Sequence, residues 1–88
     1  LHTTEIRTIA YPDPVTDELH FTYFDPLART VSLRIYDVRG IRVSAGVFQP
    51  GGSGIVHFRT NVSRLLPGVY FYSLICGDKN FRGKFIKR

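Results

Sequence analysis

Short runs of β-branched and aromatic residues recur along this chain, and turn-forming residues separate them at intervals of about 8 to 12 residues. The clearest run covers residues 30–36, where Val31, Leu33 and Ile35 alternate with polar or aromatic neighbours. This period of two is typical of a strand with one buried face, and no stretch has the period of an amphipathic helix. The sequence therefore predicts an all-β domain.

About seven strands are expected, at residues 4–9, 18–24, 30–36, 41–45, 55–58, 69–76 and 81–86. The run 69–76 is apolar on both faces, which predicts a central position in its sheet. Pro67 and Gly68 form a corner before Tyr70, and a tyrosine there commonly donates a hydrogen bond to the corner backbone. This pattern favours an immunoglobulin-like antiparallel β-sandwich, without the Cys and Trp pattern of antibody domains.

Two turns are expected to shape the sandwich. Residues 11–14 read Tyr-Pro-Asp-Pro, and prolines cannot donate to a ladder, so this segment must be an edge or a loop. Asp37 begins and Gly40 ends a predicted type I turn, in which the glycine takes a positive φ. The turn leads into a strand that carries Ile41 and Val43.

The chain has 88 residues, which is room for one modest core. We therefore expect a single domain over residues 1–88, with residues 1–8 as a linker or first strand. The first residue is Leu1, which suggests a piece of a longer or processed protein. No apolar run approaches the roughly 18 residues that a membrane-spanning helix needs.

Charge is distributed unevenly along the sequence. Residues 1–28 hold five acids and one base, whereas residues 29–88 hold eleven bases and two acids. Five of those bases lie in the last ten positions: Lys79, Arg82, Lys84, Lys87 and Arg88. Such a tail is either a footprint for an acidic partner or the solvated face of an edge strand whose charges block further pairing.

Residues suited to catalysis or metal binding are sparse. Cys76 is the only cysteine, which excludes an internal disulfide and indicates a small buried hydrophobe. The histidines His2, His20 and His57 are too far apart in sequence to form a local ligand motif. No serine or cysteine stands in a nucleophile motif. We therefore expect no enzyme, no catalytic residue, no cofactor and no metal site.

Three segments together resemble a known family. They are the opening YPDPVTDEL at residues 11–19, the strand-turn-strand VSLRIYDVRGIRV at residues 31–43, and the closing LPGVYF at residues 66–71 with GKFIKR at residues 83–88. In order and spacing they resemble the type A C-terminal sorting domains of type IX secretion cargo. One difference is Asp13 where that family usually has Asn, and both residues cap turns through a side-chain oxygen.

The resemblance implies a secretion and sorting signal rather than an activity. An exposed last strand with a basic tail can be recognised by strand addition and by charge. The expected recognition residues are Lys84, Phe85, Ile86, Lys87 and Arg88, with Phe85 and Ile86 divided between core and contact. The family-motif residues expected to maintain the fold are Tyr11, Pro12, Asp13, Pro14, Asp37, Gly40, Pro67, Gly68 and Tyr70.

The resemblance also implies partners and a location. Such domains follow an upstream cargo domain, reach the periplasm, and are recognised by the outer-membrane machinery of type IX secretion. In many cargo proteins a surface sortase then removes the domain and anchors the cargo at the cell surface. The domain itself is not expected to span the membrane, and an exposed edge strand allows a dimer in isolation.

Two alternative functions remain open at this point. An immunoglobulin-like or fibronectin-like accessory module would share the fold and would space domains or bind a glycan or a protein. Glycan binding would depend on exposed aromatic residues such as Tyr23 or Tyr36. A nucleic-acid binder would use the aromatic and basic residues of the segment 81–88, and its affinity would fall steeply with salt. The simple alternation of that segment is instead what a terminal strand shows, so no nucleic-acid partner is expected.

Overall fold

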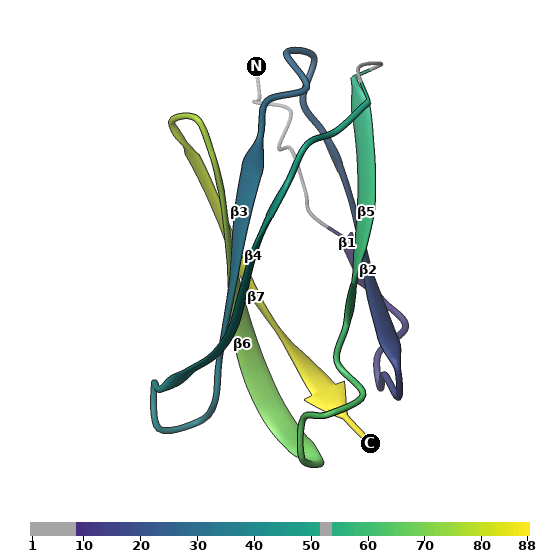
Figure 1. Cartoon of the computed structure of the whole chain (residues 1–88), viewed down its shortest axis with the longest axis vertical. Helices are drawn as coiled ribbons and strands as arrows, with labels where there is room; N and C mark the ends of the chain where they lie inside the picture. Colours follow the sequence, from purple (N-terminus) through teal and green to yellow (C-terminus); the bar gives the residue numbers. More distant parts are fainter. Residues whose placement is uncertain (1–8, 52–53) are drawn as a thin grey trace, which may run out of the picture.

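The computed structural model describes residues 9–51 and 54–88, and Figure 1 shows that the chain folds into two layers of strands. No helix occurs within these two ranges, which confirms the predicted all-β class. The seven strands are β1 (Ile9–Tyr11), β2 (Glu18–Phe24), β3 (Val31–Tyr36), β4 (Arg42–Phe48), β5 (Ile55–Asn61), β6 (Gly68–Cys76) and β7 (Lys79–Lys87).

The strands form two antiparallel sheets. One sheet has three strands in the order β1-β2-β5, and the other has four in the order β4-β3-β6-β7. Inward-facing side chains of both sheets make one core: Val15, Leu19, Phe21, Tyr23, Val31, Leu33, Ile35, Val56, Val62, Tyr70, Tyr72, Leu74, Cys76 and Phe85. The predicted sandwich is therefore confirmed.

Strands β2 and β3 follow their sequence patterns closely. In β2 the side chains of Leu19, Phe21 and Tyr23 are buried, while the residues between them face outward. Phe21 stacks on Phe58 of β5 and meets the edge of Tyr72 from the opposite sheet. Because Tyr23 is buried, it is not the exposed glycan-binding aromatic of the accessory-module alternative, and that expectation was wrong.

Strand β6 occupies the predicted central position, between β3 and β7. Only one of its apolar faces lies in the core, however. Tyr72 and Leu74 point inward, whereas Phe71 on the outer face is 43% exposed. The apolar outer face of β6 is thus open rather than covered by a second layer among the described residues.

The β3–β4 turn has the predicted chemistry. The backbone N–H groups of Arg39 and Ile41 donate to Oδ1 of Asp37 at 2.9 and 3.1 Å. Gly40 has a φ of 83°, which a residue with a side chain rarely adopts. The register between β3 and β4 shifts at Ile35/Tyr36, and Val43 has no partner in the β3–β4 ladder.

The first strand differs from the prediction. Strand β1 begins at Ile9 and ends at Tyr11, pairing with β2, so the strand expected at residues 4–9 meets it only at Ile9. Residues 4–8 lie outside the described part of the chain. The segment 11–14 does lie at an edge, because Tyr11 ends the edge strand β1.

Candidate functional site

The candidate site is the carboxyl-terminal strand β7, which lies at the edge of the four-stranded sheet. It pairs with β6 on one side, and its side chains alternate between the two faces. Phe85 is fully buried and stacks on Tyr70, whereas Lys84 and Ile86 lie exposed on the outer face. Phe85 therefore belongs to the core and Ile86 to the surface.

The end of β7 is bordered by a short segment from the opposite end of the sequence. We call residues 13–15 the strap. The backbone N–H of Val15 donates to the carbonyl of Ile86, and the N–H of Arg88 donates to the carbonyl of Val15, both at 2.9 Å. The N–H of Ile86 donates to Oδ1 of Asp13 at 2.9 Å. An asparagine has the same oxygen, so Asp13 preserves the hydrogen bond available to the family's usual residue.

The remaining part of the same edge is open. Hydrogen-bonding groups of successive residues point to opposite sides of a strand. Since Ile86 directs its N–H and C=O to the strap, Arg82 and Lys84 direct theirs to the same outer side. Within residues 9–51 and 54–88, no strand pairs with this stretch of β7.

One of the predicted contact residues is not available on the surface. Lys87 is only 7% exposed, because it faces the sandwich interior at the end of β7. Its Nζ donates to the carbonyl of Arg88 at 2.7 Å. The prediction that Lys87 is an exposed contact was therefore wrong, and the alternation of the strand is the reason. Arg88 itself remains exposed beyond it.

The loop before β6 forms a corner, which lies at the same end of the sandwich as the end of β7. The hydroxyl of Tyr70 donates to the carbonyl of Leu66 at 2.6 Å, which is the predicted tyrosine-corner hydrogen bond. Gly68 has a φ of 154°, a conformation that residues other than glycine rarely adopt. Pro67 and Gly68 thus shape the corner, and Tyr70 joins it to the core.

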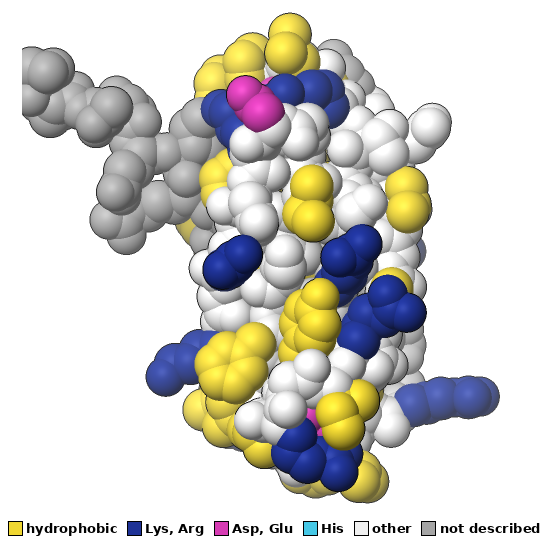
Figure 2. Space-filling view, turned by 90° about the vertical axis from the view of Figure 1, so that its left-hand side faces the viewer, with side chains coloured by type: hydrophobic (Ala, Val, Ile, Leu, Met, Phe, Trp, Pro, Cys, Tyr) yellow, Lys and Arg dark blue, Asp and Glu magenta, His cyan; other side chains and the backbone are white. Residues whose placement is uncertain are grey.

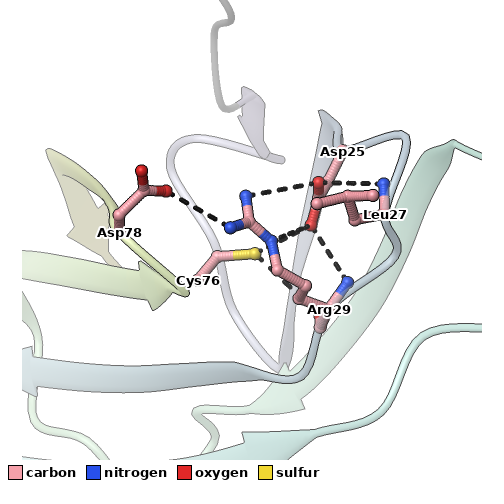
Figure 3. Close-up of polar contacts among 5 residues, drawn as sticks. All are labelled: Asp25, Leu27, Arg29, Cys76 and Asp78. Carbon is pink, nitrogen blue, oxygen red and sulfur yellow. Dashed lines mark hydrogen bonds and ion pairs between the residues drawn. The ribbon is translucent and has the colours of Figure 1, made fainter.

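A buried carboxylate near the other end of the sandwich escaped the sequence analysis. Asp25 is 1% exposed, and Figure 3 shows how its neighbours surround it. It accepts hydrogen bonds from the backbone N–H groups of Leu27 and Arg29, from the Arg29 guanidinium, and from the thiol of Cys76 at 3.0 Å. Because Asp25 follows β2 and Cys76 ends β6, this network connects the two sheets.

The network also sets the ionisation of its members. The hydrogen bond from Cys76, followed by the one from the Arg29 backbone, holds the pKa of Asp25 well below its ordinary value of 3.8. Burial, together with the adjacent Asp25, raises the pKa of the Cys76 thiol. A buried thiol with a raised pKa is a poor nucleophile, as the sequence indicated.

Histidines 20 and 57 lie close together although they are distant in sequence. Nδ1 of His20 and Nε2 of His57 are 3.2 Å apart on the outer face of the three-stranded sheet, and Tyr11 stacks on His20. No group of three potential metal ligands occurs in the described residues. His2 lies outside them. No helix in the described part of the chain is long and apolar enough to cross a membrane.

These features define a small β-sandwich module whose distinctive surface is a partly open edge strand with basic side chains. A family model described as "Secretion system C-terminal sorting domain" matches residues 9–88. The chain therefore belongs to that family. A search among curated proteins finds no match.

Family membership gives the domain its function. It is a C-terminal sorting signal for type IX secretion, and it marks a protein for export to the cell surface or for secretion. A sorting domain of this kind interacts with the type IX secretion machinery. The family is a family of sorting signals and not of enzymes.

Proposed function

We propose that the secretion machinery recognises this sorting domain at the open edge of β7 and at the exposed side chains of Lys84, Ile86 and Arg88. The observation that supports this proposal is the arrangement of the edge. The strap occupies the edge beside Ile86, and the backbone groups of Arg82 and Lys84 remain available for a strand from a partner. Added strands form main-chain hydrogen bonds that give affinity independently of sequence.

Side chains beside this edge would supply the specificity. Lys84 and Arg88 offer two exposed cations, and Ile86 offers an apolar side chain between them that is 48% exposed. An acidic partner strand would be attracted to the cations and would contact Ile86. Phe85 and Lys87 are buried, so their proposed role is to hold the strand in place rather than to contact the machinery.

The test is export of a periplasm-directed fluorescent reporter fused upstream of the domain, in a host with type IX secretion. Deletion of residues 84–88 would be a poor test, because it also removes the buried Phe85. The informative variant is Lys84→Ser combined with Arg88→Ser, which changes exposed side chains only. We expect this variant to leave the reporter in the periplasm.

A matched control is Arg59→Ser combined with Arg64→Ser. Both residues are exposed; Arg59 lies on β5 and Arg64 in the loop after it, and neither is part of β7. The control removes the same charge and should be exported normally. Normal export of the Lys84 and Arg88 variant, with its folding confirmed by a thermal melt, would contradict the proposed recognition surface. Retention of both variants would show that only net charge matters.

The later fate of the cargo also belongs to the proposal. We propose that a surface sortase cleaves the chain upstream of the sandwich and anchors the cargo domain, as the family resemblance implies. The isolated domain is further expected to dimerise through the free stretch of β7, since an unpaired edge can accept a second copy. Sedimentation of the domain alone, with and without Arg82→Pro, tests the dimer.

A further inference from the structure

The outer face of the four-stranded sheet is basic. Its four strands contain six Lys and Arg residues and no Asp or Glu. Figure 2 shows bases and hydrophobic side chains mixed across this face, with acids only near its two ends. The outward-facing bases are Arg34, Arg42, Arg82 and Lys84.

Two aromatic residues lie among these bases. The strand register puts Tyr36 beside Phe71, and Phe71 beside Lys84. One row further along the strands, Arg34 and Arg82 flank Ser73. A pair of rings thus lies next to a pair of guanidinium groups on one exposed surface.

The surface is hollowed at this point. A shallow groove of about 600 Å³ is lined by Tyr36, Phe71, Ser73, Arg82 and Lys84, with backbone of β6 and β7 between them. That volume falls in the range of known ligand sites. Arg34 and Arg82 are two strand spacings apart, or about 10 Å, so an extended ligand is needed to contact both.

We propose that this face binds an anionic polysaccharide. Sugar rings pack their C–H faces against exposed aromatic rings, and carboxylate or phosphate groups form charge-assisted hydrogen bonds with arginine. No Asp or Glu lies within the four strands to repel such a ligand. The domain is exported, and acidic glycans rather than nucleic acids are the polyanions expected outside a cell.

The groove borders the proposed recognition edge, because Lys84 lines the groove and the backbone of Arg82 belongs to the edge. The substitutions that test glycan binding change the side chains of Arg34, Phe71 and Arg82, which are not proposed secretion contacts. A variant that loses glycan binding can therefore still be exported. The two proposals can fail separately.

The test is titration of the 88-residue chain with polygalacturonate, using neutral dextran as the uncharged comparison. Arg34→Gln combined with Arg82→Gln should weaken binding by about tenfold, as expected for the loss of two exposed ion pairs. Phe71→Thr, which keeps a residue suited to strands, should also weaken it severalfold. Dextran should not bind.

The matched control is Arg59→Gln combined with Arg64→Gln, which removes the same charge from two residues that do not line the groove. It should retain the affinity of the unchanged chain. Equal losses in the two arginine pairs would show attraction by net charge alone and would overturn the proposal. The same applies if Phe71→Thr has no effect, if dextran binds equally well, or if an oligonucleotide binds more tightly than polygalacturonate.

Discussion

Replacing Asp25 by alanine should be among the most damaging single changes in this domain. The carboxylate is fully buried and accepts hydrogen bonds from two backbone N–H groups, from Arg29 and from the thiol of Cys76. The Asp25→Ala change removes both carboxylate oxygens at once and leaves the N–H donors of Leu27 and Arg29 without this acceptor. Loss of one member of a buried charged network typically costs about 3 to 5 kcal/mol.

That cost is large for a chain of this size. A domain of about 90 residues has a free energy of unfolding of roughly 5 to 10 kcal/mol, so the variant should lose about half of it. The change should also lower the melting temperature by more than about 10 °C. Urea unfolding followed by tyrosine fluorescence, together with a thermal melt, measures both quantities.

The control is Asp78→Ala. Asp78 also pairs with Arg29, at 3.2 Å, but its side chain is 88% exposed. Water replaces an exposed partner readily, so this variant should unfold almost as the unchanged chain does. If Asp25→Ala were no more destabilising than Asp78→Ala, the argument that burial makes the Asp25 network essential would be refuted.

Three further predictions concern the core and the same network. Tyr70→Phe should lower the free energy of unfolding by about 1 kcal/mol, because it removes the hydrogen bond to Leu66; an unchanged urea midpoint would contradict this. Because the folded-state pKa of Asp25 lies below its ordinary 3.8, its contribution to stability is complete above that value and is lost as the pH falls below it. The stability difference between the unchanged chain and Asp25→Asn should therefore shrink in acid, and a constant difference down to pH 2 would be inconsistent with it. Cys76 is buried and its pKa is raised by that burial, so a thiol reagent should modify it only after unfolding, and rapid labelling of the native domain would show otherwise.

Local alternation was sufficient to predict most of the strands. Strand β2 begins and ends where the pattern of Leu19 and Phe21 indicated, since one face of an antiparallel strand must be apolar to pack on the core. The β4 strand was harder to define. Its register depends on the shift at Ile35/Tyr36, and a sequence pattern does not show on which side an irregular residue will leave the ladder.

The Asp25 network was out of reach for a different reason. Asp25-Pro26 looked like an ordinary turn, and Cys76 like an ordinary core residue. Their contact joins positions 51 residues apart across the two sheets, and it depends on where strands β2 and β6 end in space. Buried polar contacts of this kind follow from the tertiary arrangement and leave little local signal.

The strap has a consequence for how a sorting signal works. Val15 pairs with Lys87 in parallel orientation, and a parallel pair needs a long connection. Here the connection is nearly the whole domain, because β2 to β6 and the rest of β7 lie between the two residues. The strap therefore lies beside the end of β7 only in a tertiary arrangement that brings the two ends of the domain together. The proposed recognition at the edge that the strap borders is therefore expected to depend on the folded domain. Under that proposal, the secretion machinery would export only chains whose sandwich is complete.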